Sequence, residues 1–173
     1  SGSAGAVGSI AGQLCKLFGA AKVVGIAGSD AKCELCKSRY KYDAMINYKT
    51  ADVPQALEQA CGAGAIDAYF DNVGGRTAKA VKALMKDGGN VAKVGSIGGD
   101  GTDEANDPRL NIKGFYAGGI LDRWPEAIRG LAKYINEGQL NYDETAEHGI
   151  ARFPQAMITM LAGGNRGKMI VRL

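Results

Sequence analysis

The sequence lacks several features that mark particular classes of protein. Its 173 residues include only four cysteines, four prolines, one tryptophan and one histidine. No apolar run approaches the roughly 20 residues that a membrane-spanning helix needs. The net charge at pH 7 is only +3, which provides no large positive field for nucleic acid. We therefore expect an ordinary globular domain that has neither a nucleic-acid partner nor a membrane span.

The cysteines and the histidine are too few for a metal site. Cys33 and Cys36 form one C-x-x-C without a second pair, and His148 is the only histidine. Structural zinc normally takes four such ligands, so we expect no metal. Reduced thiols favour a cytoplasmic location. The alternative is an organelle, because a targeting segment could precede a sequence that has no initiator Met.

Apolar periodicity predicts strands and helices that alternate along the chain. The expected helices span 7–18, 29–40, 53–62, 77–85, 124–137 and 154–162, and the expected strands 22–27, 44–47, 66–70, 90–94, 112–117 and 168–172. The helix that Trp124 opens is expected to bury Ile128, Leu131, Ala132 and Ile135. Residues 98–108 form a polar loop. This alternation predicts the α/β class, as a Rossmann-type doubly wound parallel sheet with helices on both faces.

One strand is missing from this pattern. A glycine-rich loop occupies residues 2–8, so the strand that should precede it is absent. That first strand is central in the usual doubly wound order, and its loss leaves two rows of backbone groups unpaired. We expect a sequence truncated at its N-terminus. Upstream residues, a homodimer or a partner chain would then complete the sheet.

The glycine-rich loop suits a dinucleotide. Gly2, Gly5 and Gly8 give G-x-x-G-x-x-G directly before an amphipathic helix, with Ser3 at the first position of the usual G-x-G-x-x-G. Gly5 would let the backbone approach a pyrophosphate, and Gly8 would allow close packing. The helix N-terminus offers free N–H groups and a positive dipole end. The alternative is an ordinary turn of small residues between a strand and a helix.

The end of the second expected strand indicates which dinucleotide binds. NAD-binding domains normally carry Asp or Glu about 20 residues after the loop, where this sequence has Gly28. Ser29 and Lys32 follow, and their hydroxyl and ammonium suit the 2′-phosphate of NADP(H). The alternative is that Ser29 only caps a helix and Lys32 is solvated.

Longer motifs point to a family. GAVGS (5–9), GSDxK (28–32), INYK (46–49), YFDNVGG (69–75) and GNRGK (164–168) occur in this order. With this spacing the chain resembles, over nearly all its length, the prostaglandin/leukotriene (alkenal/one) reductase group of zinc-independent medium-chain dehydrogenases/reductases. The resemblance implies an NADP-dependent oxidoreductase. Its substrates would be α,β-unsaturated ketones or aldehydes, enones or enals, whose C=C bond is reduced with NADPH.

The resemblance also implies roles for single residues. Lys32 and Tyr48 would contact the 2′-phosphate beside Ser29, and Asn72 would lie near the nicotinamide ribose. The other implied cofactor-binding residues are Gly5, Ala6, Val7 and Gly8 at the pyrophosphate, Ser96 and Ile97 at the nicotinamide, and Asn165 from the C-terminal segment. No catalytic side chain is assigned. Without the family, Tyr48 would be a half-buried aromatic after a strand and Asn72 an ordinary turn residue.

The sequence departs from the family in two places. The family's N-terminal GroES-like catalytic domain, which forms most of the substrate pocket, is absent, and the segment after Ser96 lacks the family's tyrosine. We therefore expect a truncated NADP-binding Rossmann domain at 1–141 and, at 142–173, a segment that returns to the missing domain. Two functions follow: an enone reductase in the intact parent protein, or a non-catalytic Rossmann module serving as a structural or cofactor-holding subunit of a larger assembly. Redox regulation through Cys33 and Cys36 is disfavoured.

Overall fold

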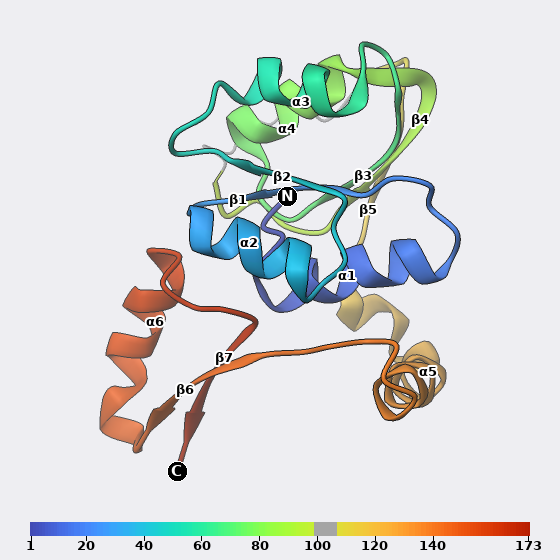
Figure 1. Cartoon of the computed structure of the whole chain (residues 1–173). Helices are drawn as coiled ribbons and strands as arrows, with labels where there is room; N and C mark the ends of the chain where they lie inside the picture. Colours follow the sequence, from blue (N-terminus) through green and yellow to red (C-terminus); the bar gives the residue numbers. More distant parts are fainter. Residues whose placement is uncertain (99–106) are drawn as a thin grey trace.

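The computed structural model describes residues 1–98 and 107–173, in which strands and helices alternate (Figure 1). The strands are β1 (Val24–Ala27), β2 (Ala44–Asn47), β3 (Ile66–Asp71), β4 (Met85–Lys93), β5 (Asn111–Gly114), β6 (Glu144–His148) and β7 (Lys168–Arg172). The helices are α1 (Ala6–Leu17), α2 (Asp30–Ser38), α3 (Val53–Cys61), α4 (Gly75–Ala83), α5 (Trp124–Asn136) and α6 (Phe153–Leu161), with 3-10 turns η1 (Ala117–Arg123) and η2 (Ile150–Arg152). The predicted α/β class is confirmed.

All strand pairs in the described residues are parallel. β1 pairs with β2, β3 and β5 flank β4, and β6 pairs with β7. The first two sheets share one hydrophobic core, to which β1 contributes Ile26 and β4 contributes Val91. Figure 1 shows α3 and α4 above these strands and α1 and α2 below them. One layer of helices on each face of a parallel layer of strands gives the doubly wound arrangement that the sequence predicted.

The middle of this layer is open. None of the strands described lies between β1 and β3, and residues 1–3 pass there instead. The Ser1 amino group donates to the Phe70 carbonyl oxygen at 2.9 Å, and Ser3 N–H donates to the Ile26 carbonyl oxygen at 3.1 Å. A cavity of about 340 Å³ lies along β1, α1 and β3. The gap expected from the missing first strand is therefore confirmed.

Two helices begin where the sequence signals a start. The Ser29 hydroxyl accepts a hydrogen bond from Lys32 N–H at 3.3 Å and caps α2. The Asp52 carboxylate accepts one from Gln55 N–H at 3.0 Å and caps α3, with Pro54 in the first turn. Each cap gives one otherwise unpaired N–H group a partner, which stabilises the helix end.

Two predicted elements are wrong in part. The helix predicted over 77–85 ends earlier than expected, because α4 ends at Ala83. The strand predicted over 90–94 begins earlier than expected, because β4 already starts at Met85. Met85 is buried and pairs with Ile66, so the core draws it into the sheet. β6 was not predicted because its sequence ETAEH has no apolar alternation; pairing with β7 makes it a strand.

The predicted burial of α5 is also wrong. The helix forms where expected, yet none of its residues is buried, and Ile128 is 60% exposed. Figure 1 shows α5 away from strands β1–β5. Periodicity identifies an apolar face but does not say what covers it.

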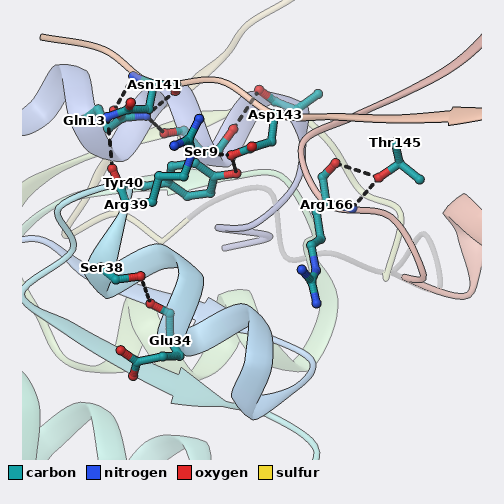
Figure 2. Close-up of polar contacts among 11 residues, drawn as sticks. Ser9, Gln13, Glu34, Ser38, Arg39, Tyr40, Asn141, Asp143, Thr145 and Arg166 are labelled. Carbon is teal, nitrogen blue, oxygen red and sulfur yellow. Dashed lines mark hydrogen bonds and ion pairs between the residues drawn. The ribbon is translucent and has the colours of Figure 1, made fainter. Parts of the chain in front are cut away.

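Polar contacts fasten the C-terminal part of the chain to α1 and to the residues that follow α2 (Figure 2). The buried Gln13 amide donates to the Asn141 carbonyl oxygen at 2.7 Å and accepts from Asn141 N–H at 2.8 Å. The Asp143 carboxylate accepts from the Tyr40 hydroxyl at 2.6 Å and pairs with the Arg39 guanidinium at 2.9 Å. These contacts fix the start of the segment that carries β6, α6 and β7.

Candidate functional site

A cavity of about 600 Å³ lies at the carboxyl ends of the parallel strands. Its walls come from loop 1–8, from residues after β1, β2, β3 and β4, and from the segment between α6 and β7. Open α/β sheets bind their ligands outside the carboxyl ends of the strands, at the point where the strand order reverses. The cavity is therefore the first place to look for a ligand.

Two helix N-termini open onto this cavity. The N-cap residues of α1 and α4 are Gly5 and Gly74, and neither helix has a side-chain cap. Residues of both first turns, including Val7 and Thr77, line the cavity. Uncapped N–H groups and two positive dipole ends favour an anion such as a phosphate. In contrast, α2 is capped by Ser29.

Glycine at position 8 allows α1 to lie directly against the loop. A Cβ atom there would lie 2.8 Å from Ser3 Cα and 2.8 Å from the Gly2 carbonyl carbon. Gly2 itself has φ +61°, a conformation that glycine adopts without strain. The Tyr42 hydroxyl donates to the Gly8 carbonyl oxygen at 2.7 Å and holds the same turn. The loop is thus packed tightly enough that a side chain at Gly8 would move it.

Glycine at position 28 is explained by Tyr48. A Cβ atom at Gly28 would lie 2.7 Å from the Tyr48 hydroxyl oxygen, so a carboxylate side chain there would displace the ring. The half-exposed Tyr48 and the partly buried Lys32 both line the cavity beside this position. Lys32 Nζ donates to the Gly163 carbonyl oxygen at 2.7 Å. Burial lowers the pKa of Lys32, and repulsion from Lys49 and Arg166 lowers it further.

The structure brings most of the predicted site residues together. Gly5, Ala6, Val7, Gly8, Lys32, Tyr48, Asn72, Ile97 and Asn165 all line the cavity. The Asn72 amide donates to the Ser1 carbonyl oxygen at 2.8 Å, and the Asn165 amide to the Gly167 carbonyl oxygen at 2.8 Å. Ser29 and Ser96 do not line it: the Ser29 hydroxyl caps α2, and Ser96 is exposed. The acidic stretch at 99–106 lies outside the described residues.

Other residues line the cavity that the sequence did not indicate. Lys49 follows Tyr48, Arg76 begins α4, and residues 160–163 come from the end of α6. The glycine pair Gly163-Gly164 was the available signal, because it ends α6 and lets the chain turn back to Asn165. Pairs of glycines occur in many turns, so this signal points to a bend and not to a ligand.

Among the described residues the cysteines form no metal site, and two of them are held as neutral thiols. Within residues 1–98 and 107–173, no group of three or more His, Cys, Asp or Glu side chains could hold a metal ion. Burial raises the pKa of the Cys36 thiol to about 12, and it also raises that of Cys33. Both are neutral at pH 7 and poor nucleophiles. No helix among those described is long and apolar enough to cross a bilayer.

Known proteins of one oxidoreductase family match this chain over nearly its whole length. The sequence model of the zinc-binding dehydrogenase family matches residues 6–133. The chain is 40% identical over 186 residues to the putative NADP-dependent oxidoreductase YfmJ of Bacillus subtilis, covering 100% of this chain and 54% of that protein. It is 39% identical over 182 residues to prostaglandin reductase 1 of Sus scrofa, covering 98% and 54%.

Solved structures show the same fold. CurA from Vibrio vulnificus, in complex with NADPH, superposes with a TM-score of 0.87 at 32% identity, covering 98% of this chain and 54% of CurA. The Escherichia coli quinone oxidoreductase complexed with NADPH gives 0.84 at 20% identity, covering 99% and 55%. The chain therefore spans about half the length of the curated relatives it matches.

Proposed function

This chain belongs to the zinc-binding dehydrogenase family and forms the nucleotide-binding half, and on that premise we propose that it binds NADP(H) in the cavity at its strand ends. One observation carries the proposal: the cavity joins two uncapped helix N-termini to Lys32, and Gly28 stands where NAD-binding domains carry a carboxylate. The helix ends suit phosphates, and the missing carboxylate disfavours NAD.

The ribose end of the cofactor is assigned to Lys32 and Tyr48. The ammonium of Lys32 provides a charged donor for the 2′-phosphate, and the Tyr48 hydroxyl a neutral one. Ser29 supports this end indirectly, by capping the helix that carries Lys32. The backbone of Gly5 to Gly8 holds the pyrophosphate at the start of α1.

The nicotinamide end is assigned to residues after β3 and β4. Asn72 holds the ribose, and Ile97 lies against the ring, while Asn165 reaches the cofactor from the C-terminal segment. NADPH supplies a hydride when bound, and these side chains would fix the face of the nicotinamide ring from which the hydride leaves. Ser96 precedes Ile97 but does not itself line the cavity. The contacts of Gln13 and Asp143 keep the segment that carries Asn165 in place.

The intact protein, on this proposal, reduces the C=C bond of α,β-unsaturated ketones or aldehydes without zinc. Two things support this: the relatives named prostaglandin reductase 1, and the lack of a metal-ligand cluster in the described residues. Residues 1–141 form the NADP-binding domain. Residues 142–173 return toward a further domain that supplies the substrate pocket.

A turnover assay on the intact protein tests this function. The enzyme is mixed with NADPH and an enone such as 3-nonen-2-one, and NADPH consumption and the mass of the product are followed. We expect the saturated ketone as the product and no reaction with the saturated ketone itself, because the C=O bond is not the target. Reduction of the saturated ketone, or of neither compound, would overturn the assignment.

A second candidate is a non-catalytic Rossmann module that holds a cofactor within a larger assembly. The gap between β1 and β3 is the place where a further strand, from the same protein or from a partner chain, would pair. Tight NADPH binding without turnover of any enone would support this candidate. The four free thiols fit a reducing, cytoplasmic setting for either function.

A further inference from the structure

We propose that Lys49 and Arg166 join Lys32 in a three-cation site that selects the 2′-phosphate of NADP(H). This inference rests on the proposed cofactor and extends it, because neither Lys49 nor Arg166 was predicted from the sequence. The site would explain how the chain binds a phosphate ester in place of the carboxylate–ribose contact of NAD-binding domains.

The three cations come from separate segments of the chain, and Arg166 itself is not among the residues that line the cavity. Lys32 lies in the first turn of α2, Lys49 follows β2, and Arg166 precedes β7. The hydrogen bond from Lys32 Nζ to the Gly163 carbonyl oxygen, 2.7 Å long, joins α2 to the end of α6. Lys32 and Lys49 line the cavity, as do both neighbours of Arg166 in sequence. Lys32 also lies close enough to Lys49 and Arg166 for their charges to act on it.

The main chain of Arg166 is fixed, while its exposed side chain has no polar partner among the described residues. The Thr145 hydroxyl donates to the Arg166 carbonyl oxygen at 2.9 Å and accepts from Arg166 N–H at 2.9 Å. Figure 2 shows the side chain extending away from Thr145. A guanidinium on an anchored backbone loses less freedom on binding, and its planar fork matches two phosphate oxygens.

These cations have no acidic partners within the described parts of the chain. No described carboxylate lies within ion-pair distance of any of the three, whereas Arg39 and Arg152 pair with Asp143 and Glu147. Asp30 and Glu34 are the acidic residues nearest to Lys32 in sequence, two positions away on either side. Asp30 accepts instead from the Asn47 amide at 2.8 Å, and Glu34 pairs with Lys37 at 2.9 Å.

Unpaired cations repel one another, and a bound dianion removes that repulsion. The lowered pKa of Lys32 fits this picture: burial is its larger cause, and the charges of Lys49 and Arg166 add to it. A phosphate ester carries up to two negative charges and accepts several hydrogen bonds. NADH has no such group at the ribose, so the three cations would act on NADPH alone.

The test measures binding of two small probes by calorimetry. 2′,5′-ADP carries the ribose phosphate and 5′-AMP lacks it. We expect Arg166→Gln and Lys49→Gln each to raise the Kd of 2′,5′-ADP about tenfold, because each variant loses one charge-assisted contact. The Kd of 5′-AMP should change by less than about twofold. Arg166→Lys should keep most of the affinity. Arg129→Gln, at an exposed position on α5, is the control and should change neither probe.

The outcomes separate this inference from the proposed cofactor. If the unaltered protein prefers 2′,5′-ADP and Arg166→Gln and Lys49→Gln keep that preference undiminished, or bind both probes equally more weakly, the three-cation site is wrong and the NADP(H) proposal stands. If the unaltered protein binds the two probes equally, both fail. An unchanged melting temperature of each variant without probe shows that folding is not the cause.

Discussion

Replacing Gly8 with Ala tests whether the phosphate-binding loop packs against α1 as described. The new methyl group would lie 2.8 Å from Ser3 Cα and from the Gly2 carbonyl carbon, and closer still to the Gly2 carbonyl oxygen. All three atoms belong to the backbone of a loop that is hydrogen-bonded to Ile26 in β1. No flexible side chain can turn away, so the loop or the helix has to move.

Two opposing effects set the size of the change. Alanine favours a helix over glycine by up to about 1 kcal/mol. Overpacking of a fixed site costs about 1–3 kcal/mol. We expect a net loss of about 1–2 kcal/mol, which for a chain of 173 residues lowers Tm by about 2–8 °C. NADPH should bind more weakly as well, because the displaced loop carries the N–H groups of the pyrophosphate site.

Gly130→Ala is the matched control, because Gly130 lies in α5 and no heavy atom comes within 4 Å of the position of its Cβ. The same change of residue should here stabilise the protein by about 0.5–1 kcal/mol. Urea unfolding followed by circular dichroism measures both variants, and NADPH fluorescence measures binding. A Gly8→Ala variant as stable as the unaltered protein, or a Gly130→Ala variant that loses as much, would refute the packing argument.

Three further predictions use other contacts. Lys32→Ala should weaken NADPH about tenfold and change NADH by less than about twofold, and equal losses in a titration would remove Lys32 from the 2′-phosphate site. Gln13→Ala should lower the free energy of unfolding in urea by about 2 kcal/mol, because it leaves Asn141 N–H and C=O without their buried partner. An unchanged free energy of unfolding would show that these contacts do not hold the C-terminal segment. Elemental analysis should find no tightly bound zinc, and one zinc per chain would contradict the absence of a ligand cluster in the described residues.

Local signals made much of the fold predictable. Ser29 and Asp52 are strong N-cap residues and mark the starts of α2 and α3, and β2 has the bounds that its apolar run indicated. Gly8 and Gly28 were identified by position in a motif, and the structure gives each a steric reason. Features set by neighbouring residues can be found in this way.

Features set by distant residues could not be predicted. Lys32 contacts Gly163, which is 131 residues away in sequence, and Arg166 comes close to Lys32 only because the chain returns there before β7. β6 is a strand through its partner β7, since its own polar sequence predicts none. The exposed face of α5 has the right periodicity for burial, but the described chain provides nothing to cover it.

The cofactor preference of the purified protein tests the central claim most directly. Titrations with NADPH and NADH under the same salt conditions give the two Kd values. The site at Lys32 and Tyr48, with no carboxylate at Gly28, predicts that NADPH binds at least about tenfold more tightly, or about 1.4 kcal/mol. Equal affinities, or tighter binding of NADH, would contradict the assignment of this cavity to NADP(H).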